Sequence, residues 1–384
     1  MDPQQLKDRV INYALSIGID KIGFASADPF LELKDRLVKH RELGFESGFE
    51  ESDIEKRTHP ELTLPQARSI IAIAIAYPTK IQDAPKSTEG QYRGMVSRAA
   101  WGEDYHHVLR KKLKQLEAFI EQEVPGARCE SMVDTGVLSD RAVAERAGLG
   151  WIGKNTNLIT PEFGSWVYLG EMLTDIPFPP DSPIEDGCGD CTLCLDHCPT
   201  SAFEQPGQLN SQKCLAFITQ MKDFVPDAYR EKIGNRIYGC DTCQQVCPKN
   251  RKINFTHQEE CLPDPELAKP LLKPLLTIGK KEFQQKFGPT ASAWRGKKPI
   301  QRNAILSLAH FKDYTAIPEL IQLLKHDERP VIRGTAAYAL GKIGGNEAID
   351  ALNEAKELEK DEKVQKEIEK GVRMLEAKGA GRNE

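Results

Sequence analysis

The 384-residue sequence contains no long hydrophobic run and little surplus charge. Its longest apolar stretch, Ile70 to Tyr77, is far shorter than the roughly 20 residues that a membrane-spanning helix needs. The start lacks a basic segment followed by an apolar one, so no signal peptide and no membrane partner are expected. The net charge of −5 excludes attraction of nucleic acid by the molecule as a whole. We therefore expect a cytoplasmic protein in which any nucleic-acid contact depends on a local patch.

Cysteine, in contrast, is well represented. Ten cysteines are present, and eight of them form one pattern. The pattern consists of a C-x2-C-x2-C-x3-C-P run, one isolated cysteine and a C-x2-C-x3-C-P run: Cys188, Cys191, Cys194 and Cys198, then Cys214, then Cys240, Cys243 and Cys247. Cys129 and Cys261 fall outside the pattern and are expected to be plain thiols.

Such runs are typical of bacterial ferredoxins, in which three thiolates of a run bind one [4Fe–4S] cube and the fourth binds the other. Zinc ribbons would show paired C-x2-C knuckles, and disulfides would need a secreted chain. The pattern therefore predicts two [4Fe–4S] clusters. The expected ligand sets are Cys188, Cys191, Cys194 and Cys247 for one cluster, and Cys198, Cys214, Cys240 and Cys243 for the other.

The periodicity of apolar residues predicts an α+β protein with four parts. Residues 1–175 are expected to form an α/β domain, with helices at 6–17, 105–123 and 140–147 and strands at 69–77, 129–133 and 166–173. Residues 176–265 hold the paired cysteine groups and are expected to form a ferredoxin-like domain. A basic linker at 266–298 and helical repeats at 299–384 follow.

The last part of the sequence repeats itself. Pro299-Ile-Gln-Arg302 recurs as Pro330-Val-Ile-Arg333, and each copy leads into an Ala- and Leu-rich helical segment followed by a second one. Helix pairs with proline at the entry and a period in the thirties indicate an α-solenoid close to HEAT repeats. A generic helical bundle is the alternative.

Basic side chains gather just before the first repeat and at its start. They are either a solvated face or a stripe that binds RNA phosphates, with Trp294 as a stacking group. The stripe would bind through Lys280, Lys281, Arg295, Lys297, Lys298 and Arg302. Another entry route for RNA lies near Lys222. Arg333, the counterpart of Arg302 in the next repeat, would either extend the stripe or be buried in the solenoid.

Two further motifs concern the first domain. Gly148, Gly150 and Gly153 match G-x-G-x-x-G, with Glu171 in the place of a ribose ligand, but a helical segment precedes them and a strand follows, which is not the dinucleotide-binding context. We expect these glycines to let the backbone pass close to a large planar cofactor.

Asp134 follows a predicted strand, and it is either a turn residue or a proton donor whose pKa is raised by desolvation.

With its parts in this order, the sequence resembles the epoxyqueuosine reductases, the family that completes queuosine synthesis on tRNA. The resemblance covers nearly the whole chain. It is carried by both cysteine groups and by the segments Arg98-Ala-Ala-Trp-Gly-Glu-Asp-Tyr-His106, Val133-Asp-Thr-Gly136, Ser139-Asp-Arg-Ala-Val-Ala-Glu-Arg-Ala-Gly148 and Gly150-Trp-Ile-Gly-Lys-Asn-Thr-Asn157. The cobalamin-dependent reductive dehalogenases are similar in the central motifs, but they carry export signals and lack the solenoid.

The resemblance implies a cobalamin in the first domain. The cofactor would be bound base-off, because the sequence has no D-x-H-x-x-G motif to place a histidine on cobalt. The family's proton donor falls on Asp134. Contacts to the corrinoid are implied for Ser139, Asp140, Arg141 and Asn157, with Arg57 and Ser97 as further candidates, and Cys240-Asp241-Thr242-Cys243 would bring one cluster to the corrin edge.

The implied activity is reduction of epoxyqueuosine to queuosine at the wobble position of tRNA. The implied partners are the tRNA anticodon stem-loop and an external low-potential electron donor of the flavodoxin or ferredoxin type, and the protein is expected to be a monomer. Two other functions stay open. One is a ferredoxin-type electron-transfer protein with a protein-binding solenoid, and the other is a cobalamin-dependent reductase of small molecules, against which the basic stripe argues.

Overall fold

The computed structural model describes residues 2–380 and divides into two compact units, each assembled from separate stretches of the chain. The first unit comprises the residues up to Lys80, Gly102–Cys214 and Asp241–Leu262. The second comprises Ile81–Trp101, Leu215–Cys240 and the residues from Pro263 onward. The predicted boundaries at 175, 265 and 298 stay predictions, and residues 381–384 of the predicted repeat domain lie outside the described residues.

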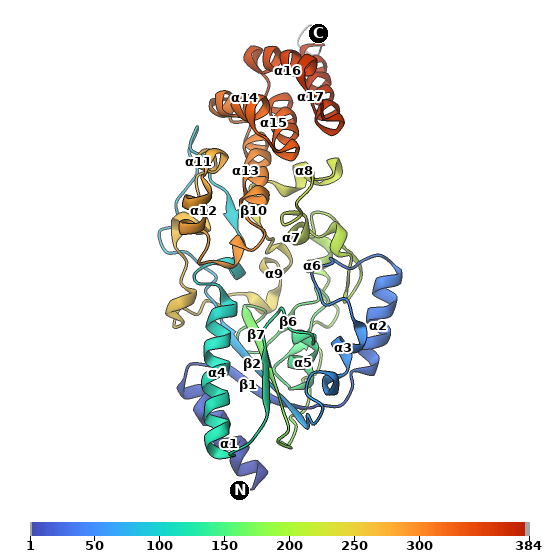
Figure 1. Cartoon of the computed structure of the whole chain (residues 1–384), viewed down its shortest axis with the longest axis vertical. Helices are drawn as coiled ribbons and strands as arrows, with labels where there is room; N and C mark the ends of the chain where they lie inside the picture. The colour runs from blue at the N-terminus through green and yellow to red at the C-terminus, as the bar shows by residue number, and fades with distance from the viewer. Residues whose placement is uncertain (1, 381–384) are drawn as a thin grey trace. The chain divides into compact units, whose positions relative to one another are not determined.

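An antiparallel sheet with the strand order β1-β2-β7-β4 forms the centre of the first unit (Figure 1). Its strands are β1 (Lys21–Ser26), β2 (Ser69–Ala76), β7 (Val167–Thr174) and β4 (Cys129–Met132). Every residue of β2 is buried, as expected for a continuous apolar run that is covered on both faces. The strands expected at 69–77, 129–133 and 166–173 are confirmed, whereas the short β1 has no sustained apolar pattern and was not predicted.

Helices cover both faces of this sheet. Helices α1 (Pro3–Ser16) and α4 (Tyr105–Glu123) pack on one face, and α5 (Asp140–Arg146) packs on the other. All three agree with the predicted helices. The connection from β4 to α5 is short, so it holds residues 133–139 at the end of the sheet, beside the first turn of α5.

The rest of the first unit is made of short elements. The two cysteine runs each contain one short helix, α6 (Leu193–Asp196) and α9 (Thr242–Gln245), and these two helices pack against each other. The remaining elements are α2 (Leu31–Glu42), α3 (Ile54–Thr58), β5 (Trp151–Ile152), β6 (Leu158–Ile159), β8 (Phe203–Gln205) and β9 (Gln208–Leu209).

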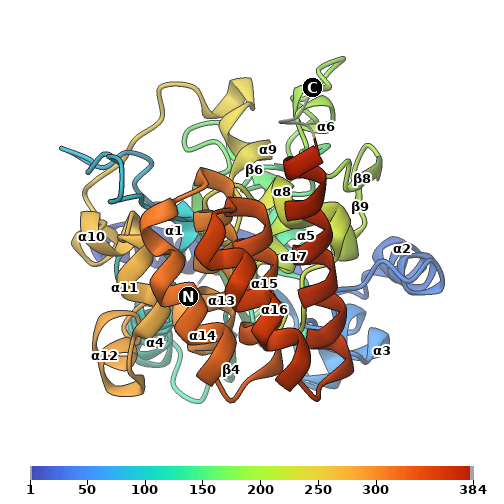
Figure 2. The ribbon, with the colours of Figure 1, turned by 90° about the horizontal axis from the view of Figure 1, so that it is seen from above.

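The second unit ends in a stack of helix pairs, which confirms the predicted solenoid. Its helices are α13 (Lys297–Phe311), α14 (Ile317–His326), α15 (Pro330–Ile343), α16 (Asn346–Leu358) and α17 (Glu362–Ala380). Helices α13, α15 and α17 lie side by side in one layer, and α14 packs on α16 in the other (Figure 2). Gly341 of α15 and Gly371 of α17 meet where a Cβ atom at Gly341 would lie 2.4 Å from the Gly371 backbone, so only glycine allows this close crossing.

Shorter elements precede the solenoid in the second unit. A two-stranded parallel ladder joins β3 (Met95–Val96) to β10 (Arg236–Tyr238). The helices are α7 (Leu215–Ile218), α8 (Asp227–Ile233), α10 (Pro265–Ala268), α11 (Leu272–Thr277) and α12 (Lys280–Lys286). Among the described residues, no helix has the length and apolar character needed to cross a bilayer.

Candidate active site

Asp104, His106 and Asp134 form a continuous chain of polar contacts in the first unit. Asp104 is the N-cap of α4, where its carboxylate accepts a hydrogen bond from the His106 backbone. The same carboxylate lies 2.7 Å from His106 Nδ1, and His106 Nε2 lies 3.3 Å from Asp134 Oδ2. The imidazole is therefore held between two carboxylates, and the strand-to-helix connection supplies the second of them.

The two aspartates determine the charge of His106. Burial alone lowers the pKa of His106, but the hydrogen bonds and charges of Asp104 and Asp134 outweigh it and raise the pKa to about 9. At neutral pH the ring is therefore an imidazolium. His106 is only 17% exposed, so solvent screens these contacts weakly.

The expectation that desolvation raises the pKa of Asp134 is wrong for this structure. Burial is the largest influence and does raise the pKa, but hydrogen bonds from His106 and Tyr105 and the charges of His106 and Arg141 together lower it. Asp134 is thus a carboxylate beside an imidazolium. Its side chain is 57% exposed, so it is open to an incoming group.

Asp134 also has an unusual backbone conformation. Its φ of 50° lies in the left-handed region, which non-glycine residues adopt at a cost of about 1 kcal/mol or more. A hydrogen bond of 2.9 Å from its backbone N–H to Asp140 Oδ2 helps to hold this conformation. Residues with strained backbones are concentrated at functional sites, and this supports a functional role for Asp134 in addition to its place in a turn.

Several of the residues expected to contact a corrinoid surround Asp134 in the first unit. Arg141 donates to the Thr156 carbonyl at 2.5 Å, and its charge acts on both Asp134 and Arg57. Burial lowers the pKa of both arginines, and the neighbouring charge of Arg141 adds to the effect on Arg57. Two desolvated guanidinium groups of like charge favour binding of a polar or anionic group between them.

Other predicted contacts lie at the ends of the same segments. Ser139 is the N-cap of α5. Asn157 Nδ2 lies 3.9 Å from the Cys243 sulfur, so the segment after β5 reaches the second cysteine group. Asp241, next to that group, is buried. Ser97 belongs to the second unit, where its N–H bonds to the Tyr238 carbonyl at 2.9 Å, two residues before Cys240.

Two glycines of the G-x-G-x-x-G match lie close to protein backbone. A Cβ atom at Gly150 would lie 2.2 Å from the Ile159 carbonyl, and one at Gly148 would lie 2.5 Å from the Ser182 carbonyl. Gly148 and Gly150 therefore allow close packing of protein backbone, and the expected approach of a planar cofactor to these glycines stays a prediction. The local structure differs from a dinucleotide-binding turn, because β5 and β6 form an antiparallel pair after α5, and the rejection of a dinucleotide site also stays a prediction.

One predicted cluster set is gathered in the first unit. Burial raises the pKa values of Cys194 and Cys247, and charge interactions link Cys194 to Cys247 and Cys188, and Cys247 to Cys188 and Cys191. Four cysteine side chains that interact by charge in this way suit a cationic iron site, because metal binding removes the repulsion between thiolates. All ten cysteines lie among the described residues, and none of them is in a disulfide.

In the other predicted set, Cys198, Cys214 and Cys243 belong to the first unit and Cys240 is the last residue of its stretch of the second unit. In the first unit, Cys198 accepts a hydrogen bond of 3.3 Å from the Ala202 N–H and lies 3.6 Å from the Thr200 hydroxyl. Hydrogen bonds to cluster sulfurs raise reduction potentials. The assignment of this set stays a prediction.

Most of the predicted basic stripe is solvent-accessible in the second unit. Lys222, Lys280 and Lys281 are exposed. Arg295, Lys297 and Lys298 are half-buried; Arg295 lies over the Trp294 ring at 4.8 Å, and Lys297 donates to the Ile278 carbonyl at 3.1 Å. These residues could contact phosphates from α12, the α13 N-terminus and the 219–223 segment.

The inclusion of Arg302 in that stripe is wrong. The residue is 1% exposed, and its guanidinium donates to the backbone carbonyls of Met221, Asp223, Ile218 and Thr219 at 2.6–3.2 Å. Its role is to hold the 218–223 segment against α13. Arg333 is half-buried, and its guanidinium makes a bidentate ion pair with Glu359 at 2.7 and 3.0 Å, so its charge is already paired within the solenoid.

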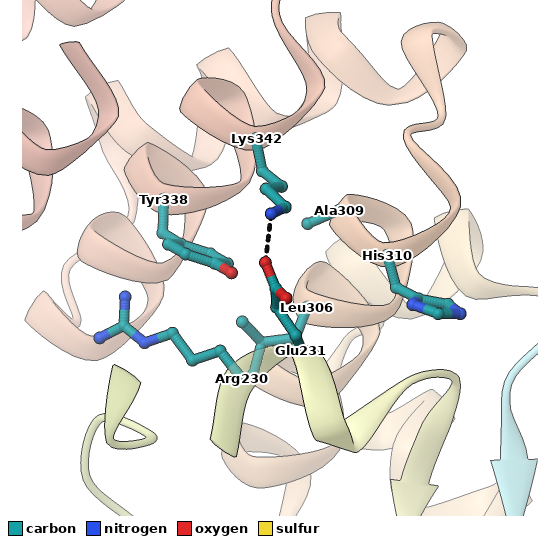
Figure 3. A pocket seen from close by; sticks show the side chains of 7 residues that line it. All are labelled: Arg230, Glu231, Leu306, Ala309, His310, Tyr338 and Lys342. Atoms are coloured by element: carbon teal, nitrogen blue, oxygen red, sulfur yellow. Dashed lines mark hydrogen bonds and ion pairs between the residues drawn. The ribbon is translucent and has the colours of Figure 1, made fainter. Parts of the chain in front are cut away.

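A separate cavity in the second unit is lined by charges that are already paired (Figure 3). Glu231 forms an ion pair with Lys342, and Arg230 pairs with Glu367 and lies 4.7 Å from the Tyr338 ring. None of the predicted site residues lines this cavity. Its charges hold α8 to α15 and α17.

Sequence reasoning missed three residues of the site. Asp104, Tyr105 and His106 stand in a motif to which the sequence alone assigns no chemical role, although an Asp before a helix is a capping signal. Glu171 has no role in the sequence once the dinucleotide site is rejected. No local pattern could have shown that a strand residue and a helix cap converge on Asp134, because that depends on the order of strands in the sheet.

Comparison with protein families places this site in a known context. Residues 57–135 match the family described as "Epoxyqueuosine reductase QueG, DUF1730", residues 187–250 match a 4Fe-4S double cluster binding domain, and residues 295–373 match HEAT repeats. The first match ends one residue after Asp134, and the second covers all eight patterned cysteines.

Similar proteins extend over nearly the whole chain. An epoxyqueuosine reductase of Bacillus cereus is 61% identical and covers 98% of this chain and 100% of its own, and one of Bacillus subtilis is 60% identical over 99% and 98%. A crystal structure of epoxyqueuosine reductase with an epoxyqueuosine-modified tRNA-Tyr stem loop is 60% identical, with a TM-score of 0.96 over 98% of this chain and 100% of that one. A Bacillus subtilis structure, 59% identical with a TM-score of 0.96 over 97% and 100%, is described as having "the Asp134 catalytic loop swung out of the active site".

Proposed function

The chain belongs to the epoxyqueuosine reductase family, and on this premise we propose that it reduces epoxyqueuosine to queuosine at the wobble position of tRNA. The observation that carries the proposal is the accessible Asp134 carboxylate, held against a protonated His106 in a chain that aligns over almost its full length with these reductases. The protein is thus an oxidoreductase that acts on tRNA.

The reaction sets what the site must supply. Converting an epoxide to an alkene breaks two C–O bonds, forms one C=C bond and releases the oxygen as water. The balance requires two electrons and two protons. The electrons would come from an external low-potential donor of the flavodoxin or ferredoxin type, and the chain must deliver protons to the leaving oxygen.

The residues around Asp134 fit a cobalamin. Arg57, Ser139, Arg141 and Asn157 offer hydrogen-bond donors suited to amide carbonyls and a phosphate, which are the polar groups of that cofactor. When bound, the cofactor would supply a strongly reducing, nucleophilic metal centre for the carbon–oxygen bond. Base-off binding agrees with the absence of a D-x-H-x-x-G motif.

The patterned cysteines would hold two [4Fe–4S] clusters, as the matching double-cluster domain indicates. Ferredoxin-type clusters reach strongly reducing potentials, down to about −700 mV across cluster types. Asn157 touches Cys243 and would lie between the second cluster and the corrinoid site. Cys240 and Cys243 would then be the ligands closest to the cofactor.

The protons would travel through His106 and Asp134. His106 holds a proton at neutral pH, and Asp134 is the carboxylate next to it that is exposed toward the site. Asp134 would receive the proton from His106 and donate it to the leaving oxygen, while Asp104 stabilises the imidazolium. We propose that the Asp134 loop of this chain can also move out of the site, as described for the Bacillus subtilis relative.

The tRNA would contact the second unit through Lys222, Lys280, Lys281, Arg295, Lys297 and Lys298. Splayed loop bases are the usual target of RNA recognition, which suits a modified base in the anticodon loop. A monomer is sufficient for this arrangement, because every proposed group comes from one chain.

Anaerobic turnover of two substrates tests the function. Reconstituted protein with cobalamin and a chemical reductant should remove one oxygen atom from epoxyqueuosine in a stem-loop, as measured by mass spectrometry of the nucleosides. The free nucleoside should react far more slowly. Equal rates on both would favour a small-molecule reductase, and no conversion of either would favour an electron-transfer protein.

A further inference from the structure

Two carboxyl groups near Asp134, those of the buried Glu171 and the half-buried Asp140, take no part in the proton transfer proposed above. Glu171 stands in β7 opposite Met132 of β4 and Ala72 of β2, and it is 1% exposed. A carboxyl group inside an apolar sheet is costly unless it is hydrogen-bonded or neutral. Asp140 is the titratable group that acts on Glu171 most directly, since its side chain raises the pKa of Glu171, and Glu171 Oε1 is buried without a hydrogen-bond partner.

The position of Asp140 connects this pair to the catalytic loop. Asp140 is the first residue of α5, and its Oδ2 atom accepts the 2.9 Å hydrogen bond from the Asp134 N–H. Its carboxyl group therefore bridges Glu171 on the strand and the backbone of Asp134. That N–H belongs to a residue with a left-handed φ, so the bond stabilises a conformation that the loop would otherwise leave readily.

Two carboxyl groups can hydrogen-bond to each other only if at least one is protonated. Burial, followed by the charge of Asp140, raises the pKa of Glu171 well above its ordinary value. Burial and the charge of Asp134 raise the pKa of Asp140 to about 6. The charged groups that act on Glu171 are these two aspartates, and Arg141 of α5 interacts by charge with Asp140. Strand β2 carries no charged residue, and α4 covers the opposite face of the sheet.

We propose that Asp140 and Glu171 form a proton-sharing carboxyl pair that holds the Asp134 loop in the conformation described here, with the Asp134 N–H bonded to Asp140. Both act as positioning residues, since Asp134 makes the contact with substrate. The proposal rests on the proposed function for its effect on turnover. Loss of the shared proton would leave two buried carboxylates that repel each other, and the loop would be released.

Hydrogen–deuterium exchange of the full-length protein tests the latch without any turnover. In Glu171→Met, exchange of the peptide that contains residues 133–139 should rise about tenfold or more at neutral pH. In Glu171→Gln it should stay near that of the parent, because an amide can still donate to Asp140. Glu130→Gln, at an exposed position on the neighbouring strand β4, is the matched control and should change nothing.

The same variants should change kcat and KM to different extents. Glu171→Met should lower kcat on the stem-loop about tenfold with little change in KM, and Glu171→Gln should restore it. In the parent, loop exchange beyond the intrinsic pH effect should increase as the pH rises above neutral, whereas Glu171→Gln should not show this increase.

Equal loop exchange in Glu171→Met and the parent, or equally fast exchange in Glu171→Gln and Glu171→Met, would overturn the latch. If Glu171→Met does not fold, the pH comparison between the parent and Glu171→Gln decides alone. Because exchange needs no substrate, a protein that fails to reduce epoxyqueuosine would contradict the proposed function while leaving this test valid.

Discussion

At the scale of single residues, the site works through the sharing of charge between His106 and its two aspartates. His106 Nδ1 lies 2.7 Å from Asp104, His106 Nε2 lies 3.3 Å from Asp134, and the imidazole is largely buried. In the proposed mechanism Asp134 differs from a simple proton donor, because it is ionised and the transferable proton is on His106. Asp134 would then donate only the proton that it receives from His106.

Replacing Asp134 with Asn should keep the shape of the loop but remove the carboxylate that is proposed to pass the proton of His106 to the leaving oxygen. General acid catalysis is typically worth about 10²–10⁴-fold, so single-turnover rates on the stem-loop should fall by about that much. Binding of the stem-loop, measured by fluorescence anisotropy, should be unchanged. A rate within about threefold of the parent would return Asp134 to a turn residue.

The pH dependence of turnover should report His106. Its raised pKa means that the contribution of the ion pair to folding is full below about 6.5 and is lost as the pH rises through about 9. The fraction of His106 that is protonated decreases over the same pH range, so kcat should fall as the pH rises through about 9. His106→Gln should be slower at neutral pH and should lack this fall. An unchanged alkaline limb in the variant would assign the titration to another group.

At the scale of elements, α13 anchors the segment that leads to the second cysteine group. Besides the Arg302 contacts, Asn303 Nδ2 donates to the carbonyls of Thr219 and Ile237 at 2.7 and 2.9 Å. The Gly239 N–H donates to the Thr219 hydroxyl at 2.9 Å, so this network ends next to Cys240. The first solenoid helix thus has a structural role toward a predicted cluster ligand.

Arg302→Met should destabilise the protein, because several buried carbonyls would be left without a donor. Each unsatisfied group costs about 1–3 kcal/mol, so a decrease of about 3 kcal/mol or more in the free energy of unfolding is expected by chemical denaturation. Lys298→Met, nearby on the same helix but partly exposed, is the control and should change it by less than about 1 kcal/mol. Equal stability of both variants would show that Arg302 is dispensable for the fold.

The stripe should act on RNA affinity alone. A triple change of exposed lysines, Lys222→Ala with Lys280→Ala and Lys281→Ala, should weaken stem-loop binding. It should also reduce the salt slope of log K by roughly 0.7 to 0.9 for each phosphate that is no longer neutralised. The control triple, Lys325→Ala with Lys356→Ala and Lys360→Ala, removes the same charge from α14 and the α16 end. If both triple variants bind the stem-loop with the same affinity and the same salt slope, the RNA contacts the protein elsewhere.

The sequence predicted elements well where one local signal was sufficient. The apolar run of β2, the long amphipathic pattern of α4 and the proline entries of the solenoid led to the right structures. Prediction from the sequence failed where a residue's property depends on partners that are distant along the chain. Arg302 looked like its basic neighbours, and only the fold brings four carbonyls to it; the pKa of Asp134 depends on a helix that begins 29 residues earlier, near Asp104.

At the scale of the whole molecule, the chain combines a catalytic unit, a double-cluster segment and a solenoid that carries exposed lysines. The predicted site residues Ser97 and Cys240 belong to the second unit, and Asp134 belongs to the first. The polypeptide passes from one unit to the other beside Cys240, so assembly of the predicted clusters should depend on the folding of both units.

The visible and EPR spectra of anaerobically purified protein, recorded with and without added cobalamin, test the central claim most directly. Chemical analysis of the same sample should find about eight iron and eight sulfide per chain, as two cubes require. Added cobalamin should bind tightly and give a Co(II) signal without nitrogen superhyperfine coupling, as expected for base-off binding without a histidine ligand. Failure to bind any corrinoid by a protein with intact clusters would contradict the proposed reductase and favour an electron-transfer protein.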